Sequence, residues 1–184
     1  MAAVSTLKYL YLAYLAKPKA ERSLVRELKR QAARKIVEFG VGDGRRTARL
    51  LQVAQRFAPA EEIHYTGIDL FEARGKGQGL PLKEAFKRLK ALGSSVQLIP
   101  GDPSSALVRS ANSLTGTDLI LIAADQDAES LGAAWKFVPR MLHDKSRVFW
   151  EQPAAKGETR WELIPHGRIH QMASAARIAS RKAA

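Results

Sequence analysis

The chain of 184 residues contains no cysteine. It therefore has no disulfide framework, no thiolate zinc site, no iron–sulfur cluster and no thiolate nucleophile. Long apolar runs are also missing, because the run near the start, YLYLAYLA at 9–16, is far shorter than the ~20 residues of a membrane-spanning helix and shows no small-residue cleavage site. We therefore expect a cytoplasmic protein that makes no membrane contact.

Acidic residues are scarce relative to basic ones, with 18 Asp and Glu against 30 Lys and Arg, a net charge of +12. The excess lies at the two ends: residues 1–35 carry nine basic and two acidic residues, and 160–184 carry five and one. Such ends attract nucleic acid through counterion release, although a merely solvated helix face has the same composition. Nucleic-acid binding through the basic termini therefore stays open.

The basic start of the chain predicts two helices. The first has an apolar stripe at helical spacing behind Ser5 or Thr6, namely Leu7, Leu10, Tyr11, Tyr14 and Leu15. Pro18 suits the first turn of a second helix, which we expect to run to about Ala33. We interpret 1–35 as a basic helical N-terminal extension, and its tyrosines, Tyr9, Tyr11 and Tyr14, as a candidate interface for a homo-oligomer.

From residue 36 onward, short aliphatic runs alternate with helical periods. The runs lie at 36–39, 65–69, 96–100, 119–124 and 147–150, and the candidate helices at about 45–57, 81–92, 103–112 and 129–142. This alternation predicts an α/β domain over 36–184 with a mostly parallel sheet. After it, TRWELI and RIHQMA predict two short strands around PHG, a C-terminal antiparallel hairpin that would bring the sheet to seven strands, followed by a basic helical tail.

The segment VEFGVGDG places three glycines, Gly40, Gly42 and Gly44, between the first strand and a helix. Ligands of open parallel sheets bind at this point, and bare glycines let the backbone approach them closely. The third glycine comes one residue too early for the dinucleotide pattern G-x-G-x-x-G, and no Gly-Lys-Ser/Thr follows as in a P-loop. A tight turn that binds no ligand is the alternative.

This segment resembles the first motif of class I S-adenosylmethionine-dependent methyltransferases, an acidic residue, here Glu38, followed by G-x-G-x-G. YTGIDL resembles the second motif, in which Asp69, with Leu70 beside it, would bind the ribose hydroxyls. LIPGD resembles the third, with Asp102 at the adenine amino group, and TDLILIAAD the fourth, with Asp125 at the methionine end. The resemblance implies a Rossmann-like, doubly wound fold and S-adenosylmethionine as the cofactor. Asp102 before Pro103 is equally suited to cap a helix.

Within that family the layout is closest to small-molecule O-methyltransferases of the catechol type, but three of their features are changed, two of them in the metal site. Ala123 stands at the position of a metal-binding Asp, Gln126 at that of the proposed base Lys, and Glu151 with Gln152 at that of an Asp-Asn pair. We therefore expect no bound metal. Cytosine C5 methylation and radical chemistry are excluded because they need cysteine.

The resemblance implies metal-independent transfer of a methyl group to an oxygen or nitrogen of a small-molecule acceptor. Because the sulfonium methyl is already activated, alignment is the main requirement and a general base is optional. The candidates for a base, on carboxylates and imidazoles, are Asp125, Asp127, Glu151, His166 and His170. Two alternatives remain: a catalytically inactive cofactor-binding module, and an RNA-binding protein that uses its basic termini.

Overall fold

The computed structural model describes residues 4–58, 62–75 and 79–182. Six strands form one sheet in the order β3-β2-β1-β4-β5-β6. Neighbours among β1 to β5 pair in parallel, and only β6 is antiparallel, to β5. The strands are β1 (Lys35–Phe39), β2 (His64–Asp69), β3 (Ser95–Pro100), β4 (Thr117–Ile122), β5 (Leu142–Pro153) and β6 (Thr159–Ile164). The expected Rossmann-like, mostly parallel sheet is confirmed.

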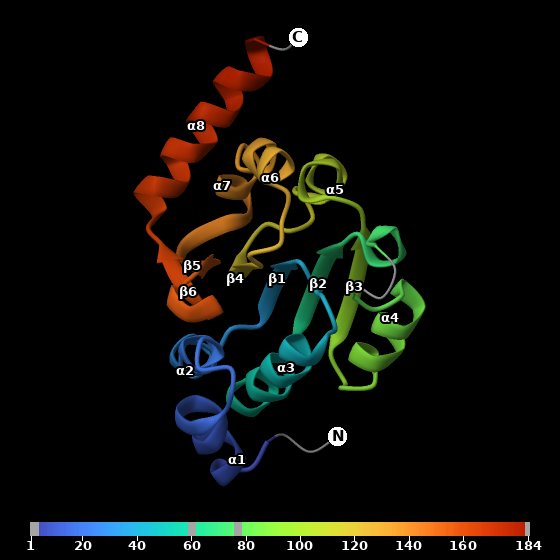
Figure 1. The fold of residues 1–184 in the computed structure, drawn as a ribbon, viewed down its shortest axis with the longest axis vertical. Helices are drawn as coiled ribbons and strands as arrows, with labels where there is room; N and C mark the ends of the chain where they lie inside the picture. Colours follow the sequence, from blue (N-terminus) through green and yellow to red (C-terminus); the bar gives the residue numbers. More distant parts are fainter. Residues whose placement is uncertain (1–3, 59–61, 76–78, 183–184) are drawn as a thin grey trace.

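Helices cover both faces of the sheet (Figure 1). On one face lie α1 (Thr6–Leu10), the π-helical turn η1 (Tyr11–Leu15), α2 (Glu21–Gln31), α3 (Arg45–Phe57) and α4 (Leu82–Lys90). On the other lie α5 (Pro103–Ser110), α6 (Ala128–Ala134), α7 (Val138–Met141) and α8 (His166–Lys182). Two short 3-10 turns, η2 (Phe71–Ala73) and η3 (Ala155–Gly157), complete the elements.

The two faces of the sheet are packed as separate apolar cores. In β1, Ile36 belongs to the core under α1 to α4, whereas Val37 and Phe39 belong to the core under α5 to α8. This alternation follows from the period of two residues in a strand. Apolar residues of the N-terminal helices, such as Leu24 and Leu28, share the first core with α3 and β1.

The C-terminal segment differs from the prediction. RIHQMA is not a strand but the first part of α8, so the antiparallel pair is β5 with β6 and the sheet has six strands rather than seven. Ile169, Ala173 and Ala176 recur at helical spacing and are buried against the core that contains α6 and α7. Burial of this stripe selects the helix over the short strand that the same letters permit.

The segment 129–142 also differs, because it holds two helices instead of one. The break lies between Trp135 and Phe137, and Pro139 stands at the start of α7. A proline at that place lacks the N–H that a continuous helix would need.

The two basic ends of the chain lie at opposite ends of the molecule, with α1 at the bottom and the end of α8 at the top of Figure 1. They therefore do not form one continuous basic surface. No helix of the residues that the structure describes is both long and apolar enough to cross a membrane.

Candidate active site

A cavity of about 950 Å³ opens where the carboxyl ends of β1, β4 and β5 meet. Its walls come from the glycine turn with the start of α3, the ends of β4 and β5, the β5–β6 connection, and the segment that leads into α2. The lining residues include Gly42, Arg46, Asp125, Glu151 and 17–21. This is the edge at which open parallel sheets bind ligands.

The glycines of the turn are required for different reasons. A Cβ on Gly40 would lie 2.5 Å from Nε2 of Gln126 and 2.7 Å from Cβ of Ala123, so the packing of the turn against the end of β4 excludes a side chain. A Cβ on Gly42 would meet nothing within 4 Å, so only its left-handed φ of +61° disfavours a side chain there. Gly42 therefore presents bare backbone to the cavity, as close approach of a ligand requires. Gly44 is the residue that precedes α3.

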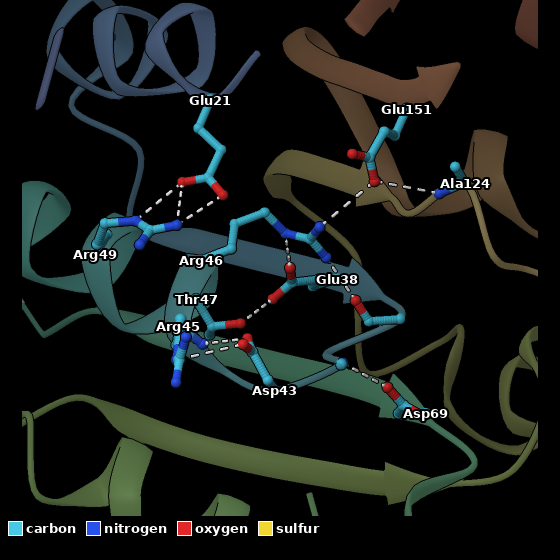
Figure 2. A network of polar contacts seen from close by, with 12 residues as sticks. Glu21, Glu38, Asp43, Arg45, Arg46, Thr47, Arg49, Asp69, Ala124 and Glu151 are labelled. Atoms are coloured by element: carbon cyan, nitrogen blue, oxygen red, sulfur yellow. Dashed lines mark hydrogen bonds and ion pairs between the residues drawn. The ribbon is translucent and has the colours of Figure 1, made fainter. Parts of the chain in front are cut away.

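Glu38 is completely buried and binds the protein itself (Figure 2). Its carboxylate accepts hydrogen bonds from Nε of Arg46 at 2.8 Å, from the Thr47 hydroxyl at 2.6 Å and from the Tyr65 hydroxyl at 2.6 Å. Burial, followed by the charge of Glu38, raises the pKa of Tyr65 well above its usual value. Glu38 is therefore an anchor for the start of α3, and its predicted contact with a cofactor stays a prediction.

Arg46 joins the glycine turn to β5 and β6 (Figure 2). Besides binding Glu38, it donates to the Gly40 carbonyl at 2.6 Å, lies 3.5 Å from a carboxylate oxygen of Glu151, and stacks 5.0 Å from the centroid of the Trp161 ring. Burial lowers the pKa of Arg46, but the charge of Glu38 and its hydrogen bond, together with the charge of Glu151, outweigh burial and the net shift is upward. Arg46 therefore fixes the turn as a charged group. Nothing beyond its place after the glycines marked it in the sequence.

The predicted ribose ligand, Asp69, is buried at the end of β2 and already accepts four hydrogen bonds. Two come from backbone N–H groups, of Gly42 at 2.9 Å and Phe71 at 3.1 Å. The other two come from the Arg74 guanidinium at 2.5 and 3.0 Å. A third nitrogen of Arg74 donates to Asp125 at 2.5 Å. Arg74 thus bridges two residues that the sequence assigned to the cofactor.

Asp102, another residue that the sequence assigned to the cofactor, caps α5. It accepts hydrogen bonds from the backbone N–H of Ser104 at 2.9 Å and of Ser105 at 3.1 Å. The hydroxyls of Ser105 and Ser130 also donate to it, and these bonds lower its pKa to about 2. Leu70, beside Asp69, is 44% exposed. The helix cap that the sequence offered as an alternative for Asp102 is therefore confirmed.

Two of the three candidate catalytic carboxylates line the cavity. Asp125 has a half-exposed side chain, and although burial raises its pKa, the bonds from Arg74 and Gln126 bring the net shift downward. Glu151 accepts from the Ala124 N–H at 3.3 Å and from the Thr159 hydroxyl at 2.6 Å. The third, Asp127, is not among the lining residues and caps α6 by accepting from the Ser130 N–H at 2.7 Å.

The histidines do not lie at this edge, so the structure does not support His166 and His170 as candidates for a base. Because β6 runs antiparallel to β5, the chain returns to the opposite edge before α8 begins. There, Nε2 of His166 lies 2.9 Å from the Ser146 carbonyl, and Ser146 in turn donates to the carbonyl of Thr117 at the start of β4. His170 lies one helical turn further along α8.

The N-terminal extension supplies one wall of the cavity, which the sequence did not indicate. Its segment 17–21 lines the cavity, and Glu21 holds it to α3 through hydrogen bonds from Arg49 at 2.6 to 2.9 Å (Figure 2). Burial raises the pKa of Glu21, and the bonds from Arg49 oppose that shift. Both partners are helical residues separated by 28 positions, so no local pattern marks the pair.

No known family model and no curated protein matches this chain. Solved structures do match. A TehB-like SAM-dependent methyltransferase from Corynebacterium glutamicum is 18% identical, with a TM-score of 0.51 over 92% of this chain and 78% of that one. The O-methyltransferase TomG from Streptomyces achromogenes is 13% identical, with a TM-score of 0.51 over 96% and 69%.

A cyclopropane-fatty-acyl-phospholipid synthase-like protein from Lactobacillus casei is 18% identical, with a TM-score of 0.52 over 95% of this chain and 71% of that one. Two further matched structures are longer, and this chain spans 64% of one and 43% of the other. At these identities the matches show the fold alone. The chain has the Rossmann-like fold of the class I SAM-dependent methyltransferases.

Proposed function

We propose that the protein is a metal-independent, S-adenosylmethionine-dependent methyltransferase that acts on an oxygen or nitrogen of a small-molecule acceptor. The observation that carries the proposal is Gly42, whose left-handed backbone faces the cavity with open space where a side chain would stand. The left-handed φ of Gly42 accounts for a glycine in a turn, and its place among the lining residues at the ligand edge of the sheet supports a role in binding. Solved structures with this fold support the same reading, among them TomG in complex with SAM.

The residues at the edge fit the parts of that cofactor. The backbone of 40–43 would approach it, and Asp69 would accept from its ribose hydroxyls once Arg74 has released the carboxylate. Asp125 would lie at the methionine end. S-adenosylmethionine supplies a methyl group that is already activated by its sulfonium.

The remaining work of the protein is to align the acceptor and exclude water. Asp125 and Glu151 are the carboxylates of the cavity that are placed to accept a proton from an acceptor, whereas Asp127 is occupied as a helix cap. Ala123 stands where catechol-type O-methyltransferases have a metal-binding Asp and carries no acidic oxygen, which supports transfer without a metal. We also propose that residues 1–35 act as an extension of the domain 36–184, since 17–21 form a wall of the cavity.

A cofactor-binding module without activity is the second candidate, and the contact of Arg74 with Asp69 favours it. A carboxylate that is already saturated by a guanidinium is a poor ribose ligand until that contact opens. RNA binding through both basic ends together is not favoured, because the ends lie far apart (Figure 1).

Calorimetric titration with S-adenosylmethionine, S-adenosylhomocysteine and NAD tests the proposal. We expect micromolar binding of the first two, weak binding of NAD, and loss of binding in Asp69→Asn. Asp118→Asn is the matched control, because Asp118 also accepts two backbone N–H bonds, from Arg34 and Lys35, at the opposite edge of the sheet. Binding that survives Asp69→Asn, or no binding of either sulfur compound, would refute the cofactor assignment.

Turnover separates the enzyme from the inactive module. Release of S-adenosylhomocysteine is followed with panels of phenols, carboxylic acids and amines as acceptors. The proposal expects turnover with one class that falls when Asp125→Asn or Glu151→Gln is introduced. Cofactor binding with no turnover in any panel would establish the module instead.

A further inference from the structure

The first helical segment is apolar on two opposite faces. One face, with Tyr9, Leu12, Ala13 and Ala16, is buried in the core. The opposite face carries the stripe that the sequence analysis identified, and it is exposed: Leu7 81%, Leu15 68%, Tyr11 55%, Tyr14 53% and Leu10 44%. We call these five residues the outer stripe. Contiguous exposed apolar patches of this kind mark interaction sites.

The rest of the fold holds this stripe outward. On the inner face, the ring of Tyr9 packs edge-on against Phe57 of α3 at 4.9 Å. At the end of the segment, the guanidinium of Arg22 donates to the carbonyls of Leu15 and Ala16 at 2.7 and 2.8 Å, and Arg26 donates to that of Ala13 at 2.9 Å. The segment cannot rotate the stripe inward without breaking these contacts.

The surroundings of the outer stripe are basic. Lys8, Lys17 and Lys19 are exposed beside it or directly after it. The two acidic residues of 1–35, Glu21 and Glu27, are largely buried, with side chains 14% and 12% exposed, and are paired with arginines. Basic side chains therefore meet solvent around the stripe while the acidic ones are neutralised inside.

We propose that the outer stripe docks on an anionic lipid surface, as a peripheral and reversible contact. Leucines that enter the acyl boundary, tyrosines at the headgroup level and flanking lysines are the composition of an interfacial helix. This inference replaces the expectation of no membrane contact, which rested on the absence of a spanning run and not on the direction of the stripe.

A second copy of the chain fits this surface less well. Two such ends would bring like charges together, since residues 1–35 carry nine basic against two acidic residues. A stable interface also buries ~800 Å² on each partner from ~20 or more residues, and the stripe has five. An anionic lipid surface complements both the apolar side chains of the stripe and the positive charge around it.

Co-sedimentation of the full chain with vesicles tests the proposal. We expect binding to vesicles of equal parts phosphatidylcholine and phosphatidylglycerol, weaker binding to phosphatidylcholine alone, and weaker binding at high salt. Leu7→Ser with Leu15→Ser should abolish binding. Lys17→Gln with Lys19→Gln should lower the partition coefficient about 25-fold, because each basic residue near an anionic surface contributes about five-fold.

The chain offers matched controls elsewhere on its surface. Val108→Ser with Ile178→Ser changes two side chains that are 66% and 56% exposed, far from the stripe, and Lys87→Gln with Lys90→Gln removes two exposed lysines of α4. Both control pairs should leave vesicle binding unchanged, and the circular dichroism and thermal midpoint of all four variants should match the parent. Because cofactor titration is a separate measurement, its failure would not affect this test.

Three results would overturn the proposal. The first is no binding to anionic vesicles, or binding that the leucine pair and its control reduce equally. The second is a concentration-dependent mass in solution that the leucine pair abolishes, which would assign the stripe to a second copy. The third is binding to polyuridylic acid that the leucine pair abolishes while vesicles do not bind, which would assign it to RNA.

Discussion

Two of the open left-handed glycines, Gly42 and Gly116, provide a matched test of the cavity. Their φ angles are +61° and +71°, and a Cβ on either would meet nothing within 4 Å. Replacing either with alanine places a methyl group on left-handed backbone, which costs about 1 kcal/mol. In a chain of this length that loss lowers the thermal midpoint by about 2–4 °C. The two variants should therefore be equally and mildly destabilised.

Their effects on ligand binding should differ, because only Gly42 lines the cavity at the carboxyl edge. In Gly42→Ala the added methyl group stands where a ligand approaches the backbone, and we expect the Kd for S-adenosylmethionine to rise at least ten-fold, about 1.4 kcal/mol. Gly116→Ala should bind like the parent. Calorimetric titration and differential scanning fluorimetry measure the two effects separately. A folded Gly42→Ala variant with unchanged affinity would refute the assignment of this backbone to the cofactor.

Three further predictions concern charged groups. Arg74→Met should tighten binding of S-adenosylmethionine at least ten-fold in calorimetry, because Asp69 is freed from hydrogen bonds to a charged partner that contribute about 1.5–3 kcal/mol each. Asp102→Asn should make the free energy of unfolding, measured by urea denaturation, depend less on pH in the acid range. In the folded parent the pKa of Asp102 is lowered from 3.8 to about 2, so its stabilisation is present above about pH 4 and is lost as the pH falls towards 2. Glu38→Gln should lower the free energy of unfolding by about 3–5 kcal/mol, because Arg46 loses its buried counter-ion.

Each of these predictions has a result that contradicts it. Weaker cofactor binding in Arg74→Met would show that Arg74 contacts the cofactor instead of competing with it. An Asp102→Asn variant whose midpoint still falls steeply between pH 4 and pH 2 would place the acid sensitivity elsewhere. For Glu38→Gln the control is Glu84→Gln, which breaks an exposed pair with Arg88 and should cost at most about 0.5 kcal/mol; equal losses would mean that burial of Glu38 is not the cause.

The sheet and the turn at its edge were predictable because their signals are local. Five aliphatic runs separated by helical periods specify parallel strands, and the glycine run marks the start of α3 at Arg45. The helix cap at Asp102 was also predictable from the Asp-Pro pair. In each case neighbouring residues carry the information.

The remaining features depend on contacts between distant residues. Arg74 reaches Asp125 across 51 positions, and no pattern in the loop after β2 indicates that its guanidinium also binds the carboxylate of Asp69. In the first helix, periodicity finds the outer stripe but cannot tell which face meets the core, since Tyr9 and Leu12 form a second apolar face. The segment RIHQMA is short enough to fit the hydrophobic period of a strand or of a helix. Burial of Ile169 selects the helix.

The four hydrogen bonds that Asp69 accepts from the chain make ligand entry an exchange of partners. A ligand that enters must donate two hydrogen bonds to the carboxylate in place of the two from the Arg74 guanidinium. An adenosine compound with both ribose hydroxyls can do so, whereas a 2′-deoxy compound offers only one. Under the proposed function, the resting ion pair would therefore admit ribonucleosides ahead of deoxyribonucleosides, and because its side chains are only 13% and 2% exposed, added salt should change that preference little.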